Sequence, residues 1–74
     1  MTVEELQKDL IENIVRIRKE KGYTQQRLSK DSGVSQPVIA RIERGVTNPQ
    51  LETVNKILVP LGQTLSIVSI PKKE

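Results

Sequence analysis

The sequence predicts an all-α domain of four helices followed by a single C-terminal strand. Aliphatic residues recur at helical spacing over residues 3–20, and two later segments each begin with a capping residue and end before a glycine. After Gly62 the composition changes to the β-branched run TLSIVSI. The 74 residues form one domain, and without cysteine or histidine the chain has neither disulfides nor a zinc site of the usual kind.

The first helix is expected over residues 3–20. Thr2 can cap it, and Glu5 stands three residues later, which is the spacing of a capping box. Gly22 is a natural stop. The stripe that should face the core consists of Val3, Leu6, Leu10, Ile14 and Ile17.

Two short helices and a tight turn should follow. Thr24 is a good N-cap for a helix through Asp31, and Ser35 can cap a third helix that Gly45 ends. Gly33 supplies the backbone freedom that the turn between them needs. Pro37 is tolerated because it falls in the first turn of the third helix.

A fourth helix should begin at Asn48-Pro49, read as an N-cap followed by proline at the first helical position, and should stop near Leu58 because of Pro60. Residues 64–70 then form a strand. A lone strand leaves its backbone groups unpaired, so we expect two copies to pair it and form a homodimer. A disordered tail is the alternative. The residues assigned to dimerisation are Leu65, Ile67, Val68 and Ile70.

Charge is unevenly distributed along the chain. Residues 1–12 hold four carboxylates and one lysine, a net charge of −3, whereas residues 13–44 hold eight cationic and three acidic side chains, a net charge of +5. A basic middle suits a polyanionic partner, although solvated helix faces would explain it equally well by themselves. The chain shows no apolar run of about 18 residues and no signal peptide, so we expect a cytoplasmic protein without membrane contact.

The second and third helices meet the requirements of a helix-turn-helix. Ser29 is small where the two helices would cross, and Gly33 stands in the turn. Branched apolar residues fill the inner positions of both helices: Leu28, Val34, Ile39 and Ile42.

The stretch TQQRLSKDSGVSQPVIARIERG closely resembles the helix-turn-helix of the Xre family, of the phage Cro and lambda-repressor type, and the resemblance extends over about residues 10–62. It implies a compact lambda-repressor-like bundle of four or five helices that binds double-stranded operator DNA as a dimer. Residues 1–62 would then form the DNA-binding domain, residues 63–70 the dimerisation strand and residues 71–74 a tail. Ser29, Pro37 and Pro60 depart from the family pattern, and Pro37 has no polar group to offer a base at its position.

The resemblance assigns roles to particular side chains. Gln25 matches the residue that contacts a phosphate at a helix N-terminus. Gln36 matches a base-reading position, where an amide can donate to and accept from adenine. Arg41 could address guanine or a phosphate, and without the motif all three would be ordinary exposed residues. The complete set of expected DNA contacts is Gln25, Gln26, Ser35, Gln36, Pro37, Val38, Arg41, Arg44 and Asn48.

Arg18 and Glu43 match a pair of charged residues that meet inside the fold in this family. We therefore expect a partly buried ion pair that orients the third helix. Losing one partner of a buried pair costs about 3–5 kcal/mol, whereas an exposed pair contributes at most about 1 kcal/mol.

These residues favour a sequence-specific transcriptional regulator, acting as a repressor. A helical core followed by one strand is similar to antitoxins of the HipB and HigA kind, which also bind a toxin protein. A solitary phage-type repressor, a restriction-modification controller protein and a protein-interaction module without DNA binding are the alternatives. We expect no enzymatic activity, cofactor or metal, because no residue cluster resembles a catalytic site.

Overall fold

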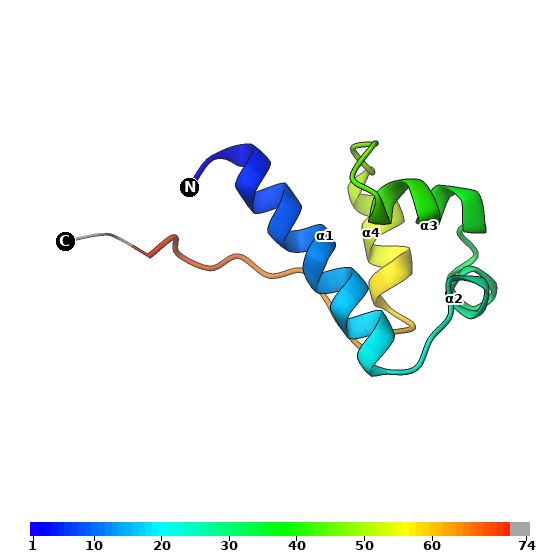
Figure 1. Ribbon diagram of the computed structural model, residues 1–74. Coiled ribbons are helices and arrows are strands. Elements are labelled where there is room, and N and C mark those ends of the chain that lie inside the picture. Colours follow the sequence, from blue (N-terminus) through cyan, green and yellow to red (C-terminus); the bar gives the residue numbers. More distant parts are fainter. Residues whose placement is uncertain (72–74) are drawn as a thin grey trace.

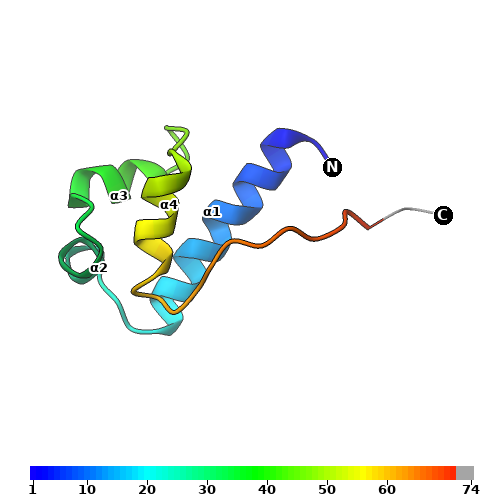
Figure 2. The ribbon, with the colours of Figure 1, turned by 180° about the vertical axis from the view of Figure 1, so that it is seen from behind.

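The computed structural model describes residues 1–71 and contains four helices (Figure 1). Their bounds are Val3–Glu20 for α1, Gln25–Ser32 for α2, Gln36–Glu43 for α3 and Leu51–Leu58 for α4. Within the described residues no strand is assigned, which confirms the all-α class. The N-terminal half of α1 and the segment after α4 both project from the bundle (Figures 1 and 2).

The α1 helix has the predicted bounds and the predicted capping box. The Glu5 backbone N–H donates to Thr2 Oγ1 at 3.1 Å, and the Thr2 backbone N–H donates to Glu5 Oε1 at 2.9 Å. The predicted buried stripe is only partly correct, because Val3 is 66% exposed and Leu6 is 42% exposed. The first two turns of α1 extend beyond the elements that cover its C-terminal half.

The core is entirely aliphatic and lies between α2, α3, α4 and the C-terminal half of α1. Side chains from both predicted helix-turn-helix helices reach it, and Leu10, Ile11, Ile17, Tyr23, Val38 and Leu65 pack around its edge. Its buried members are Ile14, Leu28, Val34, Ile39, Ile42, Val54, Ile57, Leu58 and Leu61.

Local capping signals explain most helix ends. Thr24 caps α2 by accepting from the Arg27 N–H at 3.0 Å, and Gly33 adopts the left-handed conformation with φ of 76°. Ser35 occupies the N-cap position of α3, but its hydroxyl makes no capping hydrogen bond.

The predicted start of α4 is wrong by two residues. Gln50 is the N-cap and keeps an extended backbone, so the helix begins at Leu51 and Pro49 lies outside it. A proline favours extended backbone in the residue before it, here Asn48, and the N-cap residue Gln50 has extended backbone with φ of −70° and ψ of 153°. The predicted end at Leu58 is confirmed, two residues before Pro60.

Residues 63–71 run as an extended segment away from α4 (Figure 2). Leu65 packs against the core, whereas Ile67 is 99%, Val68 80% and Ile70 52% exposed. Strand hydrogen bonds would have to come from a second chain, so the pairing of residues 64–70 across a dimer stays a prediction. Of the predicted tail 71–74, residues 72–74 lie outside the described residues. None of the helices in residues 1–71 is long and apolar enough to cross a membrane.

Candidate nucleic-acid interface

The helix-turn-helix of α2 and α3 presents one buried and one open face. Leu28 from α2 is 0% exposed, and Ile39 and Ile42 from α3 are 1% and 2% exposed. Burial of these side chains determines which side of α3 meets the core. The opposite side of α3 is therefore left facing solvent at one end of the molecule (Figure 1).

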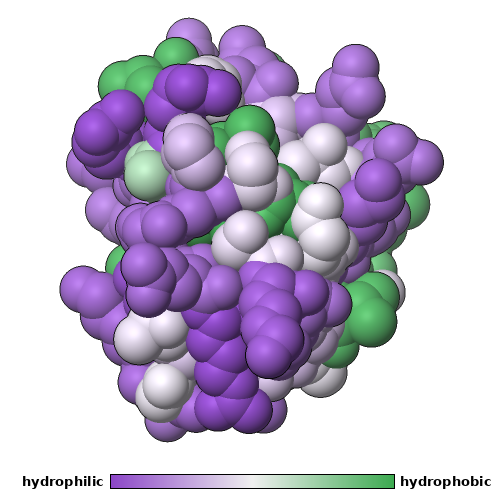
Figure 3. Space-filling view, turned by 90° about the vertical axis from the view of Figure 1, so that its right-hand side faces the viewer, coloured by the Kyte–Doolittle hydropathy of each residue, from purple (hydrophilic) through white to green (hydrophobic). Residues whose placement is uncertain are grey.

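The open side of α3 carries the side chains that the sequence assigns to base reading. Gln36, Pro37 and Arg41 are exposed, and Val38 is half-buried at the edge of the core. Ser35 is also exposed, at the N-cap of α3, and Gln26 is exposed in the first turn of α2. The face over α2 and α3 is mainly hydrophilic, with residues of intermediate hydropathy and a few hydrophobic ones between them (Figure 3).

The Glu43 carboxylate, at the end of α3, accepts hydrogen bonds from side chains of α1 and α2. Arg18 Nε donates to Glu43 Oε2 at 2.7 Å, and Arg18 Nη2 donates to Glu43 Oε1 at 3.0 Å. The side chains of Arg18 and Glu43 are 10% and 8% exposed, so this bidentate pair is largely withdrawn from water. Arg18 Nη1 also donates to the Tyr23 carbonyl at 2.7 Å. Among the described residues no buried polar side-chain atom is left without a hydrogen bond.

Gln25 belongs to the same network, which the sequence did not indicate. Its Nε2 donates to Glu43 Oε1 at 2.9 Å, and the side chain is half-buried. An amide held in this way has one N–H and its carbonyl oxygen left for other partners. Because 18 residues separate Gln25 from Glu43, no local pattern could have revealed the bond.

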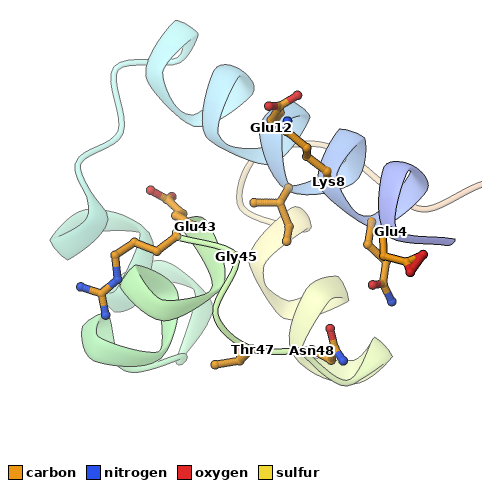
Figure 4. Close-up of a pocket in the computed structure, with 10 residues that line it drawn as sticks. Glu4, Lys8, Glu12, Glu43, Gly45, Thr47 and Asn48 are labelled. Carbon is orange, nitrogen blue, oxygen red and sulfur yellow. The ribbon is translucent and has the colours of Figure 1, made fainter. Parts of the chain in front are cut away.

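Arg44 and Asn48 are exposed but lie apart from Gln36, at the far end of α3 and in the loop after it. Both line a hollow of about 440 Å³ between that loop and the N-terminal half of α1. In Figure 4, Glu4, Lys8 and Glu12 project from α1, while Gly45, Thr47 and Asn48 form the opposite wall. The expected contacts thus fall into two groups, one at the start of α2 and α3 and one at the end of α3.

A contact between an aromatic ring and a cation lies beside α2. The Arg27 guanidinium stands 4.1 Å from the centroid of the Tyr23 ring, and Arg27 also approaches Asp31 at 3.8 Å. Arg27 remains exposed and adds positive charge next to Gln26. Sequence reasoning missed this contact, although Tyr23 is the single aromatic residue of the chain. In the part of the chain that the structure describes, no group of acidic side chains is placed to hold a metal.

The helices α2 and α3 are joined by a turn at Gly33, with an apolar face in the core and a polar face towards solvent. This arrangement defines a helix-turn-helix protein. The helix-turn-helix family matches the chain over residues 14–68, and the chain belongs to this Xre-type family.

Among curated relatives, the chain is 55% identical over 64 residues to an uncharacterised HTH-type transcriptional regulator of Haemophilus influenzae. The matched region covers 86% of this chain and 65% of that protein. It is also 43% identical over 59 residues to the HTH-type transcriptional regulator SlrR of Bacillus subtilis, covering 77% of this chain and 39% of SlrR. The chain therefore spans less than two thirds of the length of these relatives.

The fold also resembles a solved structure described as a toxin-antitoxin module from Streptococcus pneumoniae. The TM-score is 0.75 and the identity 48%, and the match covers 95% of this chain and 83% of that chain.

Proposed function

We propose that the chain is a transcriptional repressor that binds double-stranded DNA in a sequence-specific manner as a homodimer. The observation that carries the proposal is the open face of α3, where Gln36 and Arg41 are exposed while Ile39 and Ile42 hold the other side in the core. A helix held in this way can enter a major groove with its N-terminal residues towards the base edges.

Each exposed group suits a different part of the duplex. The Gln36 amide can pair with adenine, and the Arg41 guanidinium can pair with guanine. Val38 can contact a thymine methyl, whereas Pro37 offers only apolar contact. Gln26 and Ser35 lie where the free backbone N–H groups at the starts of α2 and α3 attract phosphate.

Gln25 can contact a phosphate through its backbone N–H or through the one side-chain N–H that Glu43 leaves free. Arg44 and Asn48 supply further phosphate contacts after α3. A protein that works on DNA in this way belongs in the cytoplasm, and its function is binding rather than catalysis.

Homodimer formation through residues 64–70 would cover the exposed Ile67, Val68 and Ile70. Two copies would place their α3 helices on half-sites about 34–36 Å apart, one turn of DNA. Gel filtration of the full chain should give a dimer, and deletion of residues 64–70 should give a monomer. A full chain that elutes as a monomer at micromolar concentration would refute the dimer.

An antitoxin role, with a toxin protein as second partner, is supported by the 48% identity to the Streptococcus pneumoniae module. A solitary phage-type repressor and a restriction-modification controller protein would use the same α3 face. Co-purification with the product of an adjoining reading frame distinguishes the antitoxin from these two.

Selection of bound duplexes from a random pool tests DNA reading directly. Replacing Gln36 or Arg41 with alanine should weaken binding to the selected site by about 1–3 kcal/mol and relax the preference at one base position. Lys56→Ala is the matched control, because Lys56 is an exposed cation on α4, where it pairs with Glu52. Affinity should also fall steeply with salt. Failure to bind any duplex would favour a protein-interaction module instead.

A further inference from the structure

The Glu43 carboxylate connects three helices at the point where α2 begins. Glu43 projects from the end of α3 (Figure 4). It accepts hydrogen bonds from Arg18 of α1 and from Gln25, the first residue of α2. Arg18 also donates to the carbonyl oxygen of Tyr23, the residue before the N-cap Thr24. The three side chains therefore meet at the end of α2 that the proposed function places against a DNA phosphate.

The bond from Gln25 is additional to the two that pair Glu43 with Arg18. Arg18 Nε and Nη2 already donate to both carboxylate oxygens, at 2.7 and 3.0 Å, and Gln25 Nε2 donates to Oε1 at 2.9 Å. Hydrogen bonds to a charged acceptor are stronger than those between neutral groups. The Gln25 side chain is also half-buried. Packing and this bond together restrict the rotamers of Gln25 before any ligand arrives.

Gln25 differs in this respect from the other long side chains that are expected to contact DNA. Gln26, Gln36 and Arg41 are exposed, and within residues 1–71 their side chains make no hydrogen bond or ion pair. Ordering such a side chain on binding costs conformational entropy. Gln25 has already lost much of this freedom in the free chain, so its contact with DNA avoids most of that cost.

The charge of Glu43 also determines how the Gln25 amide is oriented. A carboxylate only accepts hydrogen bonds, so the amide turns its nitrogen towards Glu43 and keeps one N–H and its oxygen for other partners. The Arg18 guanidinium, at 2.7 Å, offsets the negative charge of Glu43, which would otherwise repel a phosphate nearby. The start of α2 therefore carries an oriented amide with no net charge behind it.

We propose that Glu43 is a positioning residue for DNA binding, which sets the affinity for duplex DNA by orienting Gln25 and does not touch the DNA itself. The inference rests on the proposed function and adds to it a residue outside the expected DNA contacts. The Glu43 side chain is 8% exposed, which withdraws it from a bound duplex. Releasing Gln25 should weaken duplex binding about threefold to tenfold, which is the cost of immobilising one long side chain.

Two double variants separate the hydrogen bond from the ion pair. Arg18→Met/Glu43→Gln and Arg18→Met/Glu43→Leu both remove the two charges, but only the first keeps an oxygen that can accept from Gln25. Circular dichroism checks their folding, and fluorescence anisotropy measures binding to a duplex selected with the native chain. We expect the variant with Glu43→Leu to bind about threefold to tenfold more weakly than the variant with Glu43→Gln. The two should bind equally once Gln25→Ala is added, and a difference that persists would overturn the inference.

Base preference distinguishes a released Gln25 from a displaced α3. A phosphate contact carries no sequence information, so the loss should be the same factor for the selected duplex and for one with altered bases. A displaced α3 would instead change the base preference, and that result would also overturn the inference. Arg16→Met/Glu20→Leu is the matched control, because it removes the same two charges from an exposed pair of α1, and it should bind as the native chain does.

A measurement on the native chain is independent of how the variants fold. NMR relaxation of the side-chain amides compares the mobility of Gln25 with that of its exposed neighbour Gln26. We expect the Gln25 amide to be as rigid in the free chain as in the DNA complex, and the Gln26 amide to be mobile in the free chain. Equal mobility of the two amides in the free chain would overturn the inference.

The same binding assays separate this inference from the proposed function. A native chain that binds no duplex refutes the regulator. Native binding with no difference between the two double variants refutes only the role of Glu43.

Discussion

Replacing Arg18 with methionine removes the cation from the most buried ion pair of the fold. Methionine retains most of the aliphatic length of Arg18, so the main effect is electrostatic. The Glu43 carboxylate, 8% exposed, keeps only the bond from Gln25. Breaking a buried pair in this way costs about 3–5 kcal/mol. A chain of 74 residues has a total stability of about 4–11 kcal/mol at about 0.05–0.15 kcal/mol per residue, so the variant should lose much of it.

Urea denaturation followed by helical circular dichroism measures this loss as a lower midpoint at unchanged slope. Arg16→Met is the matched control, since Arg16 lies on the same helix and pairs with Glu20 at 3.1 Å with both side chains more than half exposed. That exposed pair should contribute less than about 1 kcal/mol. Equal midpoints for the two variants would refute the idea that Glu43 depends on Arg18. Replacing both partners with apolar residues, Arg18→Met with Glu43→Leu, should recover part of the loss, because no charge then remains buried.

Three further changes test other parts of the fold. Gly33→Ala should cost about 1 kcal/mol in thermal denaturation because φ is 76°, and Gly33→Asn should cost less; equal losses would refute a backbone origin. Gln25→Ala should cost about 1 kcal/mol for one lost hydrogen bond, and Gln25→Glu should cost more because two carboxylates would then meet; the reverse order in urea would contradict the observed bond. The Thr2 backbone N–H, and then its hydroxyl, hold the pKa of Glu5 below its ordinary value. The capping box should therefore be complete above the ordinary glutamate pKa and lost as the pH falls through the lowered value, and an NMR titration in which Thr2→Ala leaves the pKa of Glu5 unchanged would argue against it.

Local chemistry made most of the fold predictable. The bounds of α1 follow from Thr2 and Glu5, and the turn between α2 and α3 follows from Thr24 and Gly33, because each signal acts within a few residues. The start of α4 was placed two residues too early, since Asn48-Pro49 is typical of a helix start although Gln50 still has extended backbone. Pro49 can be the first residue of a helix or can lie in the segment before one, and the sequence alone does not decide between these two conformations.

Contacts between distant residues were only partly predictable. The family resemblance assigned Arg18 and Glu43 to one ion pair, and the structure places their side chains together. The bond from Gln25 to the same carboxylate was missed, because it depends on how α2 packs against the end of α3. Exposure of Val3 and Leu6 was also missed, since helical spacing shows which residues share a face but not where the covering elements end.

The open face of α3 has a consequence for how such a protein can change. Gln36, Pro37 and Arg41 make no side-chain hydrogen bond or ion pair with the rest of residues 1–71. The orientation of α3 depends instead on Ile39, Ile42 and Glu43. Substitutions at the three outward positions therefore leave the scaffold almost untouched. During evolution, the recognition surface of α3 can therefore change one residue at a time while the domain keeps its ability to fold.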